Sequence, residues 1–268
     1  MTELAEINDV ASLVKTVKEI NSHLKGQIWW RGQSDFTWKL NPSVFRSELN
    51  GYDEKSGIRR FMQKAQSRHV SVPSISNKQD WLFLMQHYGL PTRLLDWTES
   101  PLIACFFAIG HNYKDTDGAL YALSPYKLNE SQTEMSKLLM PYDAPAVEII
   151  DSIFNVGKEN VQRIIAIRPG EVDMRLLTQL SVFTLHGHSQ LLDEISNSQD
   201  FLIKIKIPMN TKKKLRKQLK QLGIRESNIF PDLDHLAKEI KSTRFRKTDL
   251  PNLPLEGNGI SVSGESTS

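Results

Sequence analysis

The sequence predicts an α+β fold built on a mixed, mainly antiparallel sheet that is flanked by helices. Segments with helical spacing and segments with strand-like alternation follow one another without the regular strand–helix–strand order of parallel sheets. The 268 residues are 39% hydrophobic and 24% charged, which is typical of a globular protein. We expect a single domain over residues 1–247 and a flexible tail over 248–268, because the tail is rich in Pro, Gly, Ser and Asn.

Helices are predicted where apolar residues recur every three or four positions and where capping residues mark an end. Ser100 and Pro101 form a typical N-cap and first-turn pair, so a buried helix is expected from Pro101 to about Gly110. Gly89 and Gly223 are natural stops for two others. The remaining expected helices cover residues 9–24, 53–70, 81–88, 131–139, 145–155, 215–222 and 233–240.

Strands are predicted in short segments rich in Ile, Val and aromatic residues. They cover residues 27–31, 119–123, 163–168, 180–185 and 201–207. The first strand is expected to end at Arg31, with Gly32 allowing the backbone to turn away. Residues 34–50 read as an irregular loop, and residues 86–101 as a polar turn between two helices.

Two clusters of polar residues beside apolar segments point to a functional site. The turn at 86–101 brings together His, Arg, Asp, Ser and two Thr, and Arg31-Gly32-Gln33 follows a buried apolar run. Polar groups next to a core need hydrogen-bond partners, and such concentrations usually mark sites. We interpret the two clusters as halves of one pocket.

Several classes of protein are disfavoured by the sequence. No apolar run is long enough to span a bilayer, and the N-terminus has no signal-peptide pattern. Cys105 is the only cysteine, which excludes an internal disulfide and favours a reducing, cytoplasmic location. Neither a Walker loop nor a G-x-G-x-x-G motif occurs. His186-Gly187-His188 lacks further ligands, so no metal site is predicted.

The charge of the chain is uneven although its net value is only +3. Residues 204–220 contain eight Lys and Arg residues and no acidic residue. Such a run is most often the solvated face of an amphipathic helix. The alternative is a surface for nucleic acid or for an acidic partner.

The two polar clusters resemble the FRG domain family, which takes its name from an aromatic-Arg-Gly-Gln motif. Trp30-Arg31-Gly32-Gln33, the motif at 87–98 and the apolar segment 104–108 carry the resemblance, and weaker likeness extends over about 20–240. Trp30 stands where Phe or Tyr is usual, which keeps an aromatic residue. The family is found in bacteria and phages and has mostly been described as a domain of uncertain function.

The layout of this family is similar to that of ADP-ribosyltransferases, and this similarity implies NAD as a substrate. In those enzymes an Arg on the first strand holds NAD, a Ser/Thr motif precedes a helix, and a later strand carries Glu or Gln. Arg31, Thr98 with Ser100, and Gln179 would take these places. The resemblance therefore implies a bacterial toxin or anti-phage effector that modifies a macromolecule, protein or nucleic acid, with a possible neutralising or regulatory protein and no membrane partner.

Each candidate residue suits a step of that chemistry. Arg31 can clamp phosphate or ribose through its planar fork, and Asp96 is the nearest carboxylate able to act as a base, since Gln179 cannot. His87 could carry a proton instead. The expected catalytic residues are Arg31, His87, Asp96 and Gln179, and the expected cofactor-binding residues are Arg31, Gly32, Gln33, Thr92, Arg93, Thr98 and Ser100.

Structural roles for the same residues remain open at this point. Asp96 could form a buried ion pair with Arg31, or pair with Arg93 three residues earlier. Thr98 and Ser100 could serve only as helix caps, and His87 could be a hydrogen-bonded structural residue. Two other functions also remain open: a non-enzymatic module that senses a nucleotide or peptide, and a nucleic-acid-processing enzyme that uses His87 and Asp96.

Overall fold

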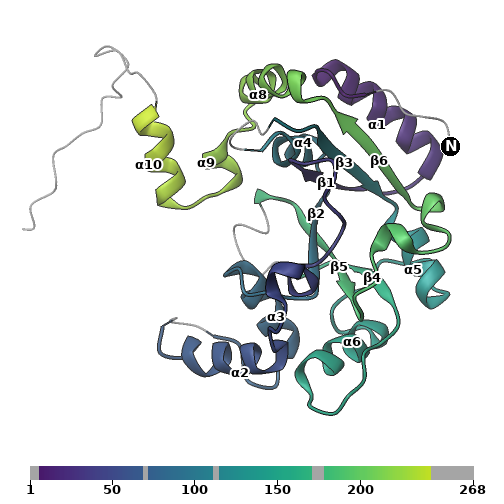
Figure 1. The fold of residues 1–268 in the computed structure, drawn as a ribbon, viewed down its shortest axis with the longest axis vertical. Coiled ribbons are helices and arrows are strands. Elements are labelled where there is room, and N and C mark those ends of the chain that lie inside the picture. The colour runs from purple at the N-terminus through teal and green to yellow at the C-terminus, as the bar shows by residue number, and fades with distance from the viewer. Residues whose placement is uncertain (1–5, 69–71, 111–114, 171–177, 243–268) are drawn as a thin grey trace, which may run out of the picture.

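The computed structural model describes residues 6–68, 72–110, 115–170 and 178–242, arranged around one six-stranded sheet (Figure 1). The strand order is β4-β5-β2-β1-β3-β6, and all neighbouring strands are antiparallel. The strands are β1 (Trp29–Gln33), β2 (Leu94–Thr98), β3 (Gly118–Leu123), β4 (Ile164–Ile167), β5 (Ser181–His186) and β6 (Leu202–Ile207). An α+β fold with a mainly antiparallel sheet is therefore confirmed. The predicted tail at 248–268 lies outside the described residues, as does the end of the predicted domain.

The helices lie largely where the apolar periodicity predicts them. They are α1 (Val10–Leu24), α2 (Glu54–Ala65), α3 (Lys78–His87), α4 (Pro101–Ile109), α5 (Pro125–Thr133), α6 (Ala144–Phe154), α8 (Lys212–Gln221), α9 (Glu226–Ile229) and α10 (Leu233–Ser242). The helix predicted at 131–139 is wrong, because α5 begins at Pro125 directly after Ser124 and ends at Thr133. The loop at 34–50 is irregular apart from two short 3-10 turns, Ser43–Phe45 and Ser47–Leu49.

The polar turn predicted at 86–101 contains a strand instead. Residues Leu94–Thr98 form β2 in the middle of the sheet, paired with β1 on one side and β5 on the other. Four of its five residues are buried, so the strand lacks the alternation of a half-exposed strand. Asp96 is its one exposed residue, and the strand therefore carries a single polar side chain to the surface.

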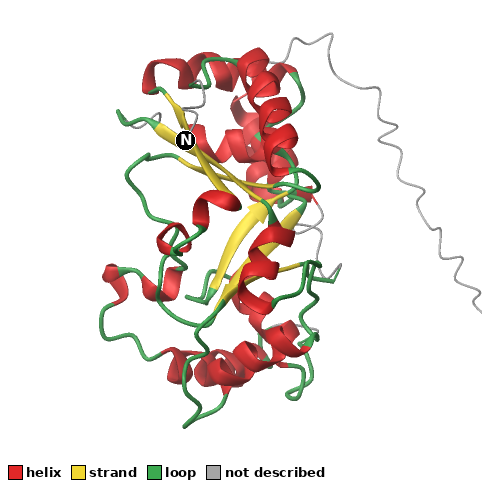
Figure 2. Cartoon of the chain, turned by 90° about the vertical axis from the view of Figure 1, so that its right-hand side faces the viewer, coloured by secondary structure: helices red, strands yellow, loops and turns green. Residues whose placement is uncertain are grey.

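Side-chain alternation along the strands divides the core between the two faces of the sheet. One face carries two clusters: α1, α4 and α8 cover β1, β3 and β6, whereas α2, α3 and α6 cover β2, β4 and β5. Figure 1 shows these two helical groups at opposite ends of the sheet, and Figure 2 shows the strands between them from the side. The other face holds the third cluster, which includes Trp29, Trp97 and Tyr121.

Gly32 lies inside β1 rather than at a turn after it, which corrects the prediction for this motif. A Cβ atom at this position would lie 1.8 Å from the carbonyl oxygen of Ala104 and 2.4 Å from the nitrogen of Ala108. Both are backbone atoms of α4. The glycine is needed because α4 packs directly on the backbone of β1, and the strand can then continue to Gln33.

Strands β1 and β2 pair only between Trp30 and Thr98, whereas β1 and β3 pair over five positions. Beyond Trp30 the two strands separate. The carbonyl of Asp96, on the side of β2 that faces β1, accepts a hydrogen bond from the Arg31 guanidinium. A side chain thus bridges the two strands at a place where a backbone ladder would normally continue.

The N-terminal helix α1 and the residues before it contact the C-terminal elements α8 and β6. The side chain of Asp9 caps α1 by accepting from the backbone N–H of Ser12, and its other carboxylate oxygen lies 2.8 Å from Nζ of Lys214 on α8. The backbone N–H of Ile7 donates to the carbonyl of Lys206 on β6. Among the described residues, no helix is long and apolar enough to cross a membrane.

Candidate functional site

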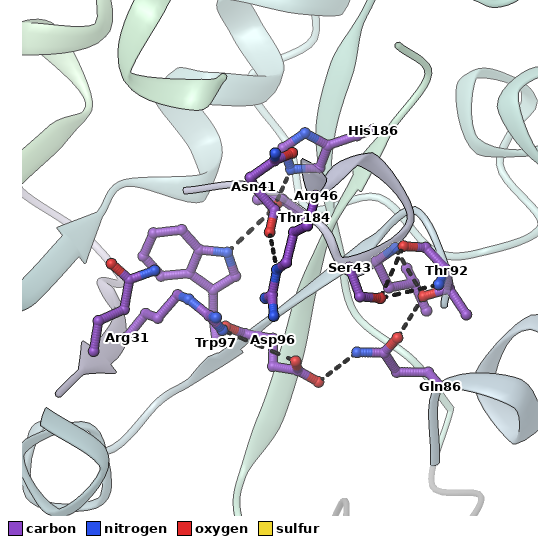
Figure 3. Close-up of polar contacts among 12 residues, drawn as sticks. Arg31, Asn41, Ser43, Arg46, Gln86, Thr92, Asp96, Trp97, Thr184 and His186 are labelled. Atoms are coloured by element: carbon purple, nitrogen blue, oxygen red, sulfur yellow. Dashed lines mark hydrogen bonds and ion pairs between the residues drawn. The ribbon is translucent and has the colours of Figure 1, made fainter. Parts of the chain in front are cut away.

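A cavity of about 550 Å³ lies at the end of β1. It brings together the second half of β1, the loop that follows it and one side chain of α4. The residues that line it are Arg31, Gly32, Gln33, Ser34, Trp38, Lys39, Asn41, Arg46, Ser47, Glu48 and Phe107. Three of them are cationic and only one is acidic, so the cavity favours an anionic ligand. Figure 3 shows the polar contacts beside it.

Arg31 projects from β1, and its side chain is only 15% exposed. Its Nη1 donates to the backbone carbonyl of Asp96 at 2.6 Å. Its Nε is buried and has no hydrogen-bond partner among the described residues. Burial lowers the pKa of the guanidinium from its ordinary value and nearby Arg46 adds to this effect, whereas Asp96 opposes it. Two neighbouring cations and an unused donor leave this arginine able to bind an anion.

Gln33 also points an unused polar atom into the cavity region. Its Nε2 donates to the carbonyl of Lys39 at 3.2 Å, which holds the loop against β1. Its Oε1 is buried and accepts no hydrogen bond from the described residues, although Gln33 is only 6% exposed. Leaving such an acceptor unpaired is unfavourable. A ligand that donates a hydrogen bond to Gln33 would remove this cost.

Asp96 is oriented by a chain of hydrogen bonds that begins in the loop between α3 and β2. The Thr92 hydroxyl accepts from the backbone N–H of Leu94, so its single proton is available for Oε1 of Gln86. The amide group of Gln86 must then direct Nε2 toward Asp96, whose Oδ1 it meets at 2.9 Å. Figure 3 shows this chain running from Thr92 through Gln86 to the Asp96 carboxylate beside Arg31.

The Asp96 carboxylate and the Arg31 guanidinium do not form the buried ion pair that one interpretation of the sequence expected. Oδ2 of Asp96 lies 3.9 Å from Nη1 of Arg31, and the aspartate side chain is 58% exposed. The pair is therefore half open to solvent and contributes little to stability. It leaves a fixed carboxylate next to a cationic cavity, which is a suitable arrangement for a general base.

Arg93 has a structural environment, and the pairing with Asp96 that the sequence left open is not formed. It forms a bidentate ion pair with Glu54 of α2, with Nη2 at 2.6 Å from Oε2, and not with Asp96. Its Nη1 donates to Asn160 and to the carbonyl of Gly187. The two side chains of the pair are 6% and 11% exposed. These contacts occupy the guanidinium, so Arg93 is an unsuitable ligand-binding group.

The hydroxyl groups of Thr92, Thr98 and Ser100 are also engaged in hydrogen bonds within the fold. Thr92 is buried, and its backbone N–H donates to Ser43 in the loop. Thr98 donates to the carbonyl of Gln179 at 2.6 Å and accepts from the backbone N–H of Ser100. The Ser100 hydroxyl accepts from the backbone N–H of Ile103, which confirms the predicted cap of α4. Helix capping is therefore the role that the contacts of Ser100 support.

Gln179 and His87, two of the expected catalytic residues, are not among the residues that line the cavity. Gln179 precedes β5, and its Nε2 donates to the carbonyl of Ile229 at 3.2 Å. His87 is the last residue of α3, and its ring lies 4.8 Å from the ring of Tyr88. The preceding residue, Gln86, makes the contact with Asp96. Gln86 was missed as a candidate although it begins the polar stretch.

A second buried polar chain lies on the same face of the sheet as Arg31. Trp97 donates through Nε1 to the Thr184 hydroxyl at 3.1 Å, and this hydroxyl lies 3.0 Å from Nε2 of His186. His186 is fully buried, and burial lowers its pKa to about 3, with the positive charge of Arg31 adding to the effect. The histidine is therefore neutral near pH 7. The sequence pointed to His186 only as part of His186-Gly187-His188; its bond to Thr184 is local, but the continuation of the polar chain to Trp97 is remote in sequence.

The potential metal ligands and Cys105 offer no further site among the described residues. In the part of the chain that the structure describes, no three His, Cys, Asp or Glu side chains gather closely enough to hold a metal ion. Cys105 lies in α4 and is fully buried. Burial raises the pKa of its thiol to about 12, so it stays protonated and packs as an apolar residue.

Comparison with known families gives one match. Residues 26–117 match the family model of the FRG domain. This range begins three residues before β1 and ends at the residue before β3, so it includes the two polar motifs and every residue lining the cavity. Comparisons of the chain with curated proteins and with solved structures found no match.

Proposed function

We propose that this chain, a member of the FRG domain family, binds NAD in the Arg31 cavity and transfers ADP-ribose to a macromolecule. Arg31, with its buried donor that has no partner in the described residues, is the observation that carries the proposal. A phosphate group is the ligand that a guanidinium fork binds best, and NAD supplies two. Lys39 and Arg46 add positive charge to the same cavity.

The remaining groups of the cavity fit the other parts of a dinucleotide. Gln33 offers a buried acceptor to an amide or amino group of the ligand. Trp38 and Phe107 offer ring surfaces for a base or for nicotinamide. A cavity of about 550 Å³ lies within the range usual for small-molecule sites.

Asp96 is the residue that we assign to the chemical step. The bond between nicotinamide and ribose breaks, and its electron pair leaves with nicotinamide. A nucleophile of the acceptor forms the new bond to the ribose carbon, and the Asp96 carboxylate takes the proton of that nucleophile. The hydrogen bond from Gln86 fixes the orientation of this carboxylate, which lies 3.9 Å from Nη1 of the cavity residue Arg31. A toxin or anti-phage effector would use this reaction to inactivate an essential macromolecule.

A second function, nucleotide binding without transfer, is favoured by one observation. Gln179, which the resemblance assigns to the place where ADP-ribosyltransferases carry Glu or Gln, donates through Nε2 to the carbonyl of Ile229. No carboxylate thus occupies that position. In this alternative the Arg31 cavity binds the same ligand and signals its presence.

Calorimetric titration with NAD and measurement of nicotinamide release separate the two functions. We expect the wild-type protein to bind NAD, and Arg31→Ala to weaken binding roughly 10- to 100-fold through the loss of charge-assisted hydrogen bonds. Asp96→Asn should keep the affinity and slow nicotinamide release by roughly a hundredfold or more. A wild type that binds NAD but releases no nicotinamide with any acceptor supports the sensing function.

A matched control tests whether the effect is specific to the cavity. Arg163 forms an ion pair with Glu148 on another part of the surface, so Arg163→Ala removes the same charge elsewhere. It should leave NAD binding unchanged. If wild type and Arg163→Ala both fail to bind NAD while remaining folded, the proposed function is rejected.

A further inference from the structure

A second cavity, of about 340 Å³, lies between α8, α9 and α10. It is lined by charged side chains of these helices, one aliphatic residue and one aromatic residue of α4. The residues are Phe106, Arg216, Lys220, Ile224, Arg225, Glu226, His235, Lys238 and Glu239. Figure 1 shows α8, α9 and α10 next to one another at one side of the sheet. The proposed function gives this cavity no role.

The two cavities share a wall in the last turn of α4. Phe106 lines the second cavity, and its neighbour Phe107 lines the Arg31 cavity. An aromatic path runs between them. The ring of Phe107 lies 6.0 Å from that of Phe230, and Phe230 stacks on His235 of the second cavity with ring centroids 4.7 Å apart. A ligand in the second cavity would therefore end close to the NAD site.

The basic residues of α8 divide into two groups. Lys212, Lys214 and Arg216 are used by the fold: they bond Ser34, Asp9 and the carbonyl of Gly110 respectively. Lys213, Lys217 and Lys220 are exposed and have no ion-pair or hydrogen-bond partner among the described residues. Their spacing of four and three residues places these three lysines on one stripe of the helix.

This stripe continues toward the second cavity. Lys220 lines it, and exposed Lys238 of α10 lies on the same lining. The helix α8 itself contains no acidic residue. Both carboxylates that line the cavity have other contacts: Glu239 contacts Arg225 and Ser227, and Glu226 lies 3.6 Å from Nε2 of His235. An unneutralised row of cations fits a partner with regularly spaced negative charges.

We propose that this basic surface, made of Lys213, Lys217, Lys220 and Lys238, binds the phosphate backbone of single-stranded nucleic acid and presents it as the acceptor. The identity of the acceptor rests on the proposed transferase function, whereas the binding itself does not. Nucleic acid fits better than an acidic protein for two reasons. The cations follow a line, as a backbone of phosphates does, and aromatic rings lie beside them as in other single-strand sites.

Fluorescence anisotropy with a labelled single-stranded RNA or DNA of about 15 nucleotides tests this binding. Affinity should fall with salt, and each phosphate contact contributes about 0.7 to the slope of log affinity against log salt. The triple variant Lys213→Gln, Lys217→Gln, Lys220→Gln should reduce this slope by about 2 and weaken binding at least tenfold at low salt. These exposed side chains make no contact on which folding depends.

Two controls make the result specific. The variant Lys15→Gln, Lys18→Gln, Lys64→Gln removes the same charge from exposed positions on α1 and α2 and should bind nucleic acid like the wild type. Arg31→Ala should also keep nucleic-acid binding, even where it loses NAD. Failure of NAD binding thus leaves this result intact, and the two proposals can fail separately.

Three results would overturn the inference. The first is a wild type that does not bind either oligonucleotide at low salt. The second is an equal loss of affinity in the two triple variants, which would make the effect one of net charge. The third is displacement of the oligonucleotide by polyglutamate of the same charge as effectively as by unlabelled oligonucleotide, which would identify an acidic protein as the partner.

Discussion

The two motif arginines, Arg31 and Arg93, have opposite environments within one sheet. Arg93 is 6% exposed and forms a bidentate pair with Glu54, supported by Asn160 and Gly187. Arg31 is 15% exposed and bonds one backbone carbonyl, while its Nε has no hydrogen-bond partner in the described part of the chain. Both belong to polar stretches that flank apolar segments, so the sequence alone makes them look alike.

The two arginines differ in how far the fold satisfies their hydrogen bonds. The fold satisfies Arg93 with a buried carboxylate from α2 and leaves no donor of it directed to the cavity. Arg31 stands where β1 and β2 separate, and the nearest carboxylate, Asp96, is turned toward solvent. Hydrogen-bond satisfaction, and not burial alone, therefore identifies the residue with a possible binding role.

The largest expected effect on stability comes from Arg93→Ala. It leaves Glu54 buried without its cation, which should cost about 3–5 kcal/mol of the free energy of unfolding. Arg31→Ala removes one charge-assisted hydrogen bond and should cost no more than about 1.5–3 kcal/mol. Urea denaturation of both variants measures the comparison. Equal losses would contradict the distinction, and the double change Arg93→Leu with Glu54→Leu should recover most of the stability.

A smaller loss of stability is expected for Gly32→Ala, which adds one methyl group next to Arg31. The new Cβ meets backbone atoms of Ala104 and Ala108 at distances that require α4 to move. Overpacking of this kind costs roughly 1–3 kcal/mol and shifts Phe107 at the cavity wall. Denaturation and NAD titration of the same variant should both show the change. Unchanged stability would mean that α4 can withdraw from β1 freely.

The smallest expected effect on stability near neutral pH comes from His186, which lies on the same sheet face as Arg31. Its folded pKa of about 3 lies below the ordinary value of 6.5, so the unfolded chain binds a proton over this range that the folded chain does not. Stability should therefore fall as pH decreases from about 6.5 toward 3. His186→Gln should flatten this dependence in thermal melts across the range. Exposed His23→Gln is the control, and an equal flattening there would contradict the assignment.

Local signals in the sequence predicted those parts of the fold that depend on neighbouring residues. The cap at Ser100 and the start of α4 follow from two adjacent residues. Strand β2 was missed because it forms by pairing with β5, which is remote in sequence. In this pairing Asp96 lies opposite Phe183. The partner of Arg93 is likewise remote, since Glu54 lies 39 positions earlier. Such pairings have no signature within either segment.

The candidate site was predicted only in part, because local motifs reveal some of its residues and remote contacts supply the others. The motifs identified Arg31, Gln33 and Asp96, which lie in or beside the cavity. Lys39 and Arg46 were missed because they stand in an irregular loop without periodicity. Arg31 lies where β1 and β2 separate. This position depends on how the strands pair, which the local residue types do not encode.

The contact between Lys212 and Ser34 has a consequence for the order in which the cavity is completed during synthesis. Lys212 is fully buried, and its Nζ donates at 2.7 Å to the carbonyl of Ser34, a residue of the cavity wall 178 positions earlier. A ribosome synthesises the cavity loop early but adds its support only when α8 emerges. The growing chain thus lacks this support for the cavity wall until α8 has emerged from the ribosome.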